Sequence, residues 1–263
     1  MSRGPTALVA AAAVTVAAVA GGIGTAPAGA AARTVSAEQV AAGLVANDGE
    51  LRAAIDAWRA AEDPPRAEPP ADVMDGSRYL QKTIRTLVRK RSLARNVRDR
   101  LPARLEGQVQ SLIVAQRDLV KLSNGWPPHE VETGKPEPLA NLASHYDEAH
   151  DRHGIGQHYL AAINLVESKF GRVKNDSVAG AQGPMQFIPS TWEIYGNGGN
   201  IQDPHDAILA AANLLRDNGA PADYPRALRA YNDSSLYVDA VTRYARQIKR
   251  DRYALYFFYC FGP

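Results

Sequence analysis

Residues 155–171, IGQHYLAAINLVESKFG, combine an almost wholly apolar run with a single carboxylic acid at its end. Apolar side chains occupy more than one side of a helix drawn through Ile155–Val166, which predicts a largely buried helix. Glu167 follows directly, and Gly171 is a suitable residue to end the helix. A buried carboxyl group is costly to ionise, so its pKa rises and it suits general acid catalysis near neutral pH. A surface glutamate at a frayed helix end is the alternative interpretation.

Two further segments place Glu167 in a specific order of motifs. Residues 177–187 read SVAGAQGPMQF, and residues 230–232 read AYN. The succession Glu-Ser, then Ser-x-Ala-Gly-Ala-x-Gly-x-Met-Gln, then Ala-Tyr-Asn resembles the three signature motifs of the lytic transglycosylases with a lysozyme-like (SLT) domain. The resemblance covers about residues 139–248. Pro184 stands where the family usually has leucine, which makes the chain more similar to a related branch of the same enzymes.

The resemblance implies a fold, an activity and the residues that perform it. Such enzymes have a lysozyme-like all-α catalytic domain and cleave the MurNAc–GlcNAc bond in the glycan strands of bacterial peptidoglycan. Glu167 matches their catalytic acid and base. The residues that match the lining of the substrate groove are Ser168, Met185, Gln186, Tyr231 and Asn232.

The residue types are compatible with catalysis by one carboxyl group. A hydrolysing glycosidase normally needs two carboxyl groups that flank the bond. The only acid near Glu167 in sequence is Asp176, and its Asn-Asp-Ser context is typical of a turn. One acid suffices if the 2-acetamido oxygen of MurNAc attacks its own anomeric carbon, while Glu167 acts first as acid and then as base. We expect Tyr231 to hydrogen-bond Glu167 and to hold its side chain in place.

The expected product of this mechanism is a 1,6-anhydro-MurNAc end, formed without water. Two alternatives remain open from the sequence. One is a muramidase that hydrolyses the same β-1,4 bond. The other is a non-catalytic protein that binds the cell wall or serves as a scaffold and keeps the groove only to hold glycan.

The first 32 residues have the pattern of a secretory signal peptide. Arg3 supplies a positive charge, residues 7–24 are an unbroken run of small and apolar residues, and residues 28–30 read AGA, a suitable cleavage site. A membrane anchor helix is the alternative, although this run is at the short end for a span. We therefore expect export from the cytoplasm, to the cell wall or the extracellular space, with no stable membrane span after processing.

Composition and proline distribution predict two parts after the signal peptide. Hydrophobic residues make up 45% of the 263 and charged residues 22%, which excludes a wholly disordered chain. Helical spacing predicts a helical hairpin accessory region within residues 36–122, with a proline-rich linker at 62–76. A second linker at 123–138 precedes the lysozyme-like domain expected over 139–263.

The predicted hairpin is strongly basic. From Arg78 to Lys121 there are 12 basic and 3 acidic side chains. Residues 140–263, in contrast, contain 12 basic and 13 acidic side chains. Four arginines recur at steps that allow several of them to share one helical face, namely Arg85, Arg89, Arg95 and Arg98. An exported protein rarely meets nucleic acid, so we expect either a solvated face or attraction to anionic wall polymers.

No cofactor and no metal site are predicted. The four histidines between His145 and His158 lack the His-Glu-x-x-His spacing, and Asn197 and Asn200 replace the carboxylates that a calcium loop needs. Activity on peptidoglycan should therefore survive treatment with EDTA, because the chemistry expected of Glu167 needs no Lewis acid. Release of soluble fragments from purified sacculi, before and after chelation, measures this. Loss of release that zinc or calcium restores would contradict it.

Overall fold

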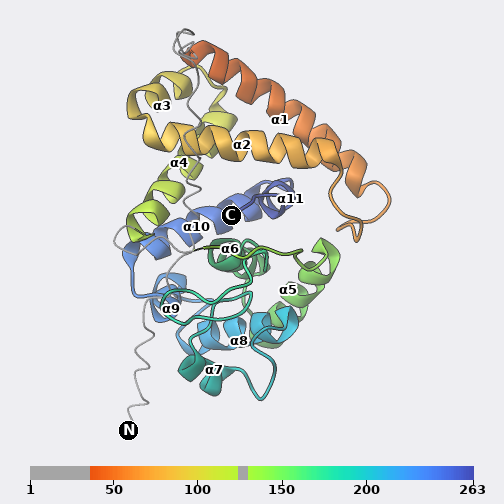
Figure 1. Ribbon diagram of the computed structural model, residues 1–263, viewed down its shortest axis with the longest axis vertical. Coiled ribbons are helices and arrows are strands. Elements are labelled where there is room, and N and C mark those ends of the chain that lie inside the picture. Colours follow the sequence, from red (N-terminus) through yellow and green to blue (C-terminus); the bar gives the residue numbers. More distant parts are fainter. Residues whose placement is uncertain (1–35, 124–129) are drawn as a thin grey trace.

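The computed structural model describes residues 36–123 and 130–263, which fold into α-helices joined by loops (Figure 1). The expected all-α fold class is confirmed. In these residues the extended pairings are the isolated bridges Thr133–Val173 and Gln182–Phe187. The predicted signal peptide lies outside the described residues, as does part of the predicted linker at 123–138. The helices are, in chain order, α1 (Ala37–Arg59), α2 (Ala71–Arg89), α3 (Arg91–Arg98), α4 (Ala103–Ser123), α5 (Leu139–His153), α6 (Gln157–Ser168), α7 (Pro189–Tyr195), α8 (Pro204–Asp217), α9 (Tyr224–Tyr231), α10 (Ser235–Arg250) and α11 (Ala254–Tyr259).

Helix α1 begins at a capping box. The Ser36 Oγ accepts a hydrogen bond from the Gln39 backbone N–H at 3.1 Å, and the Gln39 Oε1 accepts one from the Ser36 N–H at 3.0 Å. Two N–H groups that the first turn leaves without helical partners are thereby satisfied. Leu44, Leu51 and Ile55 are buried along one side of α1, so this helix contributes an apolar stripe to the core.

The proline-rich linker is shorter than predicted. Helix α2 begins at Ala71, directly after Pro70, so residues 71–76 of the predicted linker are helical. Proline is compatible with the start of a helix, because the first turn does not need its missing N–H group. Val73 and Ser77 are fully buried in these first turns of α2, and their burial against the core favours the helix over a linker.

The predicted hairpin contains an additional helix at its corner. Helices α2 and α4 pack against each other, and the short α3 lies between them in the chain. The break between α2 and α3 is at Lys90, whose φ of −111° and ψ of 82° lie outside the helical region. The predicted two-helix hairpin therefore consists of three helices, with the short α3 connecting α2 and α4.

The four arginines of the predicted basic face lie on two helices, α2 and α3. The Arg85 Nη2 donates a hydrogen bond to the backbone carbonyl of the last residue at 2.8 Å. The Arg98 Nη2 lies 3.0 Å from the Glu106 Oε1. Arg89 and Arg95 are exposed. Arg85 and Arg98 thus have partners within the protein, whereas the exposed Arg89 and Arg95 lie on different helices.

Helix α10 joins the N-terminal helices to the rest of the molecule. It packs against α4 and against α6, and Figure 1 shows it between the two. The buried apolar side chains form one cluster that extends from Ala41 in α1 to Phe261 after α11. Residues 36–123 and 139–263 therefore share one hydrophobic core.

The C-terminal aromatic segment packs inward. Helix α11 contacts α2, α6 and α10, and Phe257, Phe258 and Tyr259 are buried. Burial also raises the pKa of the adjacent Cys260 thiol to about 11. Within residues 36–123 and 130–263, no helix has both the length and the apolar character that crossing a membrane requires.

Replacement of Ile113 by alanine tests the shared core. Ile113 of α4 is fully buried, so the substitution leaves a cavity and should lower the free energy of unfolding by about 2–5 kcal/mol. Because both parts share one core, tryptophan fluorescence and far-ultraviolet circular dichroism should report the same transition, at a lower guanidinium concentration. The control is Val45→Ala at a position that is 44% exposed, where a change within about 0.5 kcal/mol is expected. Two separate transitions in the native chain would contradict the shared core.

Candidate active site

Glu167 lies in the last turn of α6, a helix in the centre of the packed core. Every α6 residue from Leu160 to Ser168 is buried, and Glu167 is only 1% exposed. Helices α5, α8, α10 and α11 all contact α6. The prediction of a helix that is apolar on more than one side is therefore confirmed, and the alternative of a surface glutamate at a frayed end is wrong.

The chain leaves α6 through three consecutive residues in the left-handed region. The φ angles are +55° at Lys169, +61° at Phe170 and +77° at Gly171, so the helix ends at Ser168, three residues before the predicted stop. Left-handed backbone is unfavourable for residues with a side chain. The Ser168 Oγ stabilises the turn, because it accepts a hydrogen bond from the Gly171 N–H at 2.7 Å and donates one to the Pro184 carbonyl at 2.5 Å. Ser168 thereby ties the end of α6 to the loop that follows.

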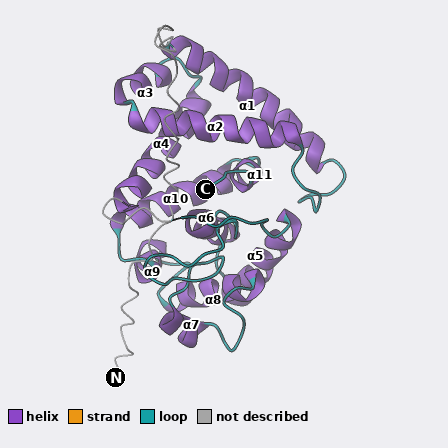
Figure 2. Cartoon of the chain, viewed as in Figure 1, coloured by secondary structure: helices purple, strands orange, loops and turns teal. Residues whose placement is uncertain are grey.

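The segment between α6 and α7 contains a closed loop without a helix (Figure 2). Gln182 and Phe187 exchange two backbone hydrogen bonds of 2.9 Å, which close the loop. Gly183 has a φ of +73°, and a Cβ atom there would lie 1.9 Å from the Ile201 carbonyl oxygen, so only glycine fits. Gln186 is 2% exposed and donates from Nε2 to the Gly183 carbonyl at 3.0 Å. Its buried Oε1 has no hydrogen-bond partner among the described residues.

The carboxyl group of Glu167 is held by Tyr237, in the first turn of α10. The fully buried Tyr237 donates its hydroxyl proton to the Glu167 Oε1 at 2.6 Å, while the Oε2 has no hydrogen-bond partner within the described residues. Burial raises the pKa of Glu167 to about 8, although the Tyr237 hydrogen bond and the charge of Lys169 act in the opposite direction. Within residues 36–123 and 130–263, no second carboxylate contributes to this pKa. Glu167 is therefore mainly protonated at neutral pH and able to donate a proton.

Tyr231 does not form the hydrogen bond to Glu167 that the sequence analysis expected. Its hydroxyl proton goes to the Met185 carbonyl oxygen at 2.6 Å, and a hydroxyl group has only one proton to donate. The Tyr231 ring instead stacks on Tyr237, with centroids 6.3 Å apart and an interplanar angle of 4°. The sequence did not predict the role of Tyr237. Nothing in the local pattern shows whether Tyr231, at the end of α9, or Tyr237, at the start of α10, reaches Glu167.

The structure brings the predicted site residues together in one buried assembly. Contacts run from Ser168 to the 182–187 loop, from this loop to Tyr231, and from Tyr231 through Tyr237 to Glu167. All the predicted groove residues are less than 5% exposed: Ser168, Met185, Gln186, Tyr231 and Asn232. The predicted residues therefore support one another within the core.

Asp176 directly precedes the turn formed by residues 177–180. It is exposed, and its Oδ2 accepts a hydrogen bond from the Gln182 Nε2 at 3.0 Å. The adjacent Ser177 accepts from the Ala181 N–H through its Oγ at 3.0 Å and from the Gly180 N–H through its carbonyl at 2.8 Å. Asp176 thus lies beside a turn and is not a second acid beside Glu167.

A group of possible metal ligands lies at the start of α8. One ligand atom from each of Asp203, His205 and Asp206 lies within 4.8 Å of the others. The Asp203 Oδ1 already caps the helix by accepting from the His205 and Asp206 N–H groups at 2.9 and 3.1 Å. The His205 Nε2 lies 2.9 Å from the Glu148 Oε2, and this hydrogen bond is the main cause of the raised pKa of His205. Capping and ion pairing account for the arrangement.

The fold around the buried acid is all-α, the class expected of a lysozyme-like domain. Residues 144–253 match the family model described as Transglycosylase SLT domain, a segment that contains Glu167, the 182–187 loop, Tyr231 and Tyr237. No curated protein and no solved structure matched in the corresponding comparisons. Residues 144–253 therefore form a domain of the transglycosylase SLT family, whose members are lytic transglycosylases that act on peptidoglycan.

Replacement of Tyr237 by phenylalanine should raise the pKa of Glu167 above its value of about 8. The hydroxyl group of Tyr237 stabilises the ionised carboxylate and so lowers this pKa. A hydrogen bond to a charged group contributes about 1.5–3 kcal/mol, which corresponds to an upward shift of roughly one to two units. Infrared titration of the carboxyl stretch, assigned by its loss in Glu167→Gln, measures the change.

The matched control is Tyr231→Phe. This variant also loses one buried hydroxyl group, but that group donates to the Met185 carbonyl and not to Glu167. We expect a smaller change in the Glu167 titration in this variant. An unchanged titration in Tyr237→Phe, or equal shifts in both variants, would show that the Tyr237 hydroxyl does not stabilise the Glu167 carboxylate.

Proposed function

We propose that Glu167 alone cleaves the MurNAc–GlcNAc β-1,4 bond, first as general acid and then as general base. The observation that carries this proposal is the buried carboxyl group with a pKa of about 8, held by one hydrogen bond from Tyr237. A carboxyl group that burial keeps protonated at neutral pH costs stability, and such groups are concentrated at functional sites.

In the first step Glu167 donates its proton to the glycosidic oxygen, and the bond from this oxygen to the anomeric carbon of MurNAc breaks. The 2-acetamido oxygen of the same MurNAc attacks the anomeric carbon and forms a cyclic oxazolinium ion. The Tyr237 hydroxyl, 2.6 Å from the Oε1, stabilises the carboxylate that Glu167 has become. In the second step this carboxylate takes the proton of the C6 hydroxyl, whose oxygen displaces the acetamido oxygen and closes a 1,6-anhydro ring.

The lack of a second acidic influence on Glu167 favours this route over hydrolysis. A hydrolase with two carboxyl groups places them about 5–9.5 Å apart across the bond. Among the described residues, the causes of the raised pKa of Glu167 are burial, Tyr237 and Lys169, and they include no acidic side chain. Asp176, the nearest acid in sequence, is exposed. A scaffold protein would gain nothing from a buried, destabilising acid.

Some residues around Glu167 position it, and others are suited to bind the substrate. Ser168 holds the end of α6 and Tyr231 holds the Met185 carbonyl, so these residues position the acid and its loop. Gln186 has a buried Oε1 without a partner among the described residues, which suits it to accept a hydrogen bond from a sugar hydroxyl or amide. Because Glu167 is 1% exposed, productive binding of a glycan requires side chains over the carboxyl group to move.

The proposed substrate lies outside the cytoplasm, in agreement with the signal peptide expected at residues 1–32. In this proposal the exported enzyme acts in the cell wall or the extracellular space. The exposed Arg89 and Arg95 attract anionic wall polymers in a salt-dependent manner.

Replacement of Glu167 by glutamine should reduce the release of fragments from purified sacculi by about a hundredfold or more, because the amide cannot donate a proton. The native enzyme should leave 1,6-anhydro-MurNAc ends, identified by mass spectrometry of the products. The control is Asp176→Asn, the same change of acid to amide at an exposed position, which should retain activity.

Three outcomes would contradict parts of the proposal. Near-full turnover in Glu167→Gln would exclude Glu167 as the acid. Reducing MurNAc ends in place of anhydro ends would show a muramidase. No cleavage by the native chain, together with binding to sacculi, would identify a scaffold protein. Thermal unfolding of each variant shows that a loss of activity is not a loss of fold.

A further inference from the structure

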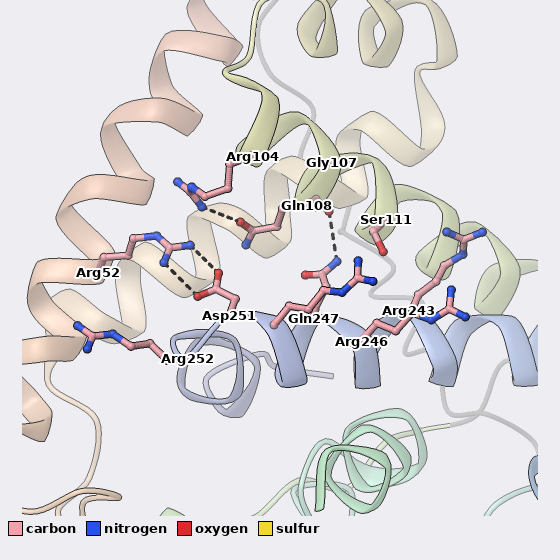
Figure 3. Close-up of a pocket in the computed structure, with 11 residues that line it drawn as sticks. Arg52, Arg104, Gly107, Gln108, Ser111, Arg243, Arg246, Gln247, Asp251 and Arg252 are labelled. Atoms are coloured by element: carbon pink, nitrogen blue, oxygen red, sulfur yellow. Dashed lines mark hydrogen bonds and ion pairs between the residues drawn. The ribbon is translucent and has the colours of Figure 1, made fainter. Parts of the chain in front are cut away.

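The described residues form a cavity of about 680 Å³ where α1, α4 and α10 meet, here called the arginine pocket (Figure 3). Of its eleven lining residues six are arginines, and Asp251 is the single acidic one. The volume is in the range of small-ligand sites and exceeds by far the roughly 30 Å³ of one water molecule. A concave site with such an excess of positive charge attracts anions.

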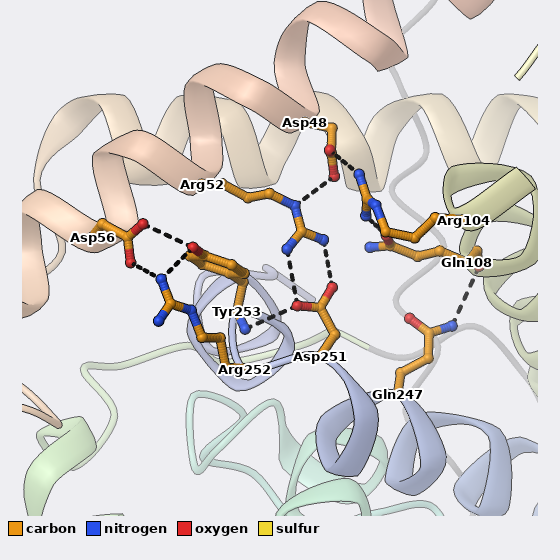
Figure 4. A network of polar contacts seen from close by, with 9 residues as sticks. All are labelled: Asp48, Arg52, Asp56, Arg104, Gln108, Gln247, Asp251, Arg252 and Tyr253. Atoms are coloured by element: carbon orange, nitrogen blue, oxygen red, sulfur yellow. Dashed lines mark hydrogen bonds and ion pairs between the residues drawn. The ribbon is translucent and has the colours of Figure 1, made fainter. Parts of the chain in front are cut away.

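Three of the six arginines are neutralised within the protein, on the side of the pocket next to α1 (Figure 4). The ion pairs are Arg52 with Asp251 and Asp48, Arg104 with Asp48, and Arg252 with Asp56. Arg52 and Asp251 form a bidentate contact, with N–O distances of 3.0 and 2.5 Å. These pairs connect α1, α4 and the end of α10, and they give the pocket a fixed wall.

The other three arginines, Arg243, Arg246 and Arg250, project from α10. Within the described part of the chain none of them forms an ion pair, and the Nε of Arg243 is buried without a hydrogen-bond partner. A buried donor that stays unsatisfied is costly. An oxyanion in the pocket would neutralise the charges of the three guanidinium groups.

Helix geometry directs these three side chains to one place. Arg243, Arg246 and Arg250 follow at steps of three and four, so they lie on one face of α10. Across the pocket, Gly107 of α4 has no atom within 4 Å of the position that a Cβ would occupy. The glycine therefore leaves space opposite the arginines that any other residue would partly fill.

We propose that the arginine pocket binds a linear anion with two or more adjacent phosphate groups, held by Arg243, Arg246 and Arg250. Guanidinium groups bind phosphate through paired hydrogen bonds. A tetrahedral phosphate presents oxygens toward both α10 and α4, which a planar carboxylate does not. Three unpaired arginines and the volume of the cavity match a short run of phosphates better than one ion.

The pocket is separate from Glu167. Helix α10 contributes Tyr237 to the acid at its first turn and the arginines at its later turns, and it packs between α4 and α6 (Figure 1). Among the described residues, none of the three arginines forms a hydrogen bond or an ion pair with Glu167 or with the 182–187 loop. Binding in the pocket can therefore be measured whether or not the function proposed for Glu167 is correct.

Isothermal titration calorimetry of the full chain with inorganic tripolyphosphate tests the proposal. We expect binding of one tripolyphosphate per chain, weakened about tenfold or more in Arg246→Gln/Arg250→Gln, because charge-assisted hydrogen bonds are lost. Gly107→Leu should weaken binding without any change of charge, because the side chain occupies the pocket. Leucine has a higher helix propensity than glycine, so α4 should be preserved.

Matched controls separate the pocket from general electrostatic attraction. Gly49→Leu places the same side chain at another open helical glycine, and Arg66→Gln/Arg78→Gln removes the same charge at exposed positions. Both should bind tripolyphosphate like the native chain. A titration with long-chain polyphosphate tests whether the natural ligand is a polymer or a small anion. If it is a polymer, each protein chain should bind long-chain polyphosphate more tightly than tripolyphosphate.

The proposal would be overturned by absence of tripolyphosphate binding to the native chain, or by equal losses in the pocket variants and the controls. Equal or tighter binding of citrate would refute the preference for phosphate. Tighter binding of a single-stranded oligonucleotide would assign the pocket to nucleic acid. Unchanged binding in Gly107→Leu, with the fold intact by circular dichroism, would place the anion elsewhere.

Discussion

The hydrogen bond between Tyr237 and Glu167 is the contact on which the architecture of the site depends. It joins the first turn of α10 to the last turn of α6 inside the core, at a donor–acceptor distance of 2.6 Å. A carboxyl group at 1% exposure is unfavourable when ionised. The contact limits this cost by satisfying one oxygen, and it fixes the side chain that we propose to donate a proton. The loop 182–187 and the Tyr231–Tyr237 stack complete the surroundings.

Helix α10 carries this contact and also links the two halves of the sequence. It packs on α6 beneath the acid and on α4 of the N-terminal helices. Its later turns present Arg243, Arg246 and Arg250 to the arginine pocket. One rigid helix thus contributes to a buried acid site and to a basic cavity. The N-terminal helices are consequently part of the structure that positions the catalytic domain, because they cover a face of α10 that would otherwise be exposed.

Much of the site was accessible from sequence because its signals are local. The apolar run before Glu167 predicts a buried helix, and the three motifs place Ser168, Gln186 and Tyr231 near one another. The prediction was wrong where two residue types were equivalent locally. Tyr231 ends α9 and Tyr237 lies in the first turn of α10, and only the packing of α10 against α6 decides which hydroxyl reaches Glu167. The prediction of a linker at 62–76 was partly wrong because it also depended on packing. Val73 is buried against the core, so residues 71–76 of the predicted linker form the start of α2.

The sequence by itself determined the all-α fold class, the central helix with its terminal acid, and the turn beside Asp176. These depend on periodicity, capping and turn chemistry, which act over a few residues. Only the tertiary structure decided that Glu167 is buried to 1% exposure, that Tyr237 holds it, and that Arg243 and Gly107 face one cavity. The exposure of a side chain and the distance between residues on different helices depend on how the helices pack, and packing combines contacts between segments far apart in the chain.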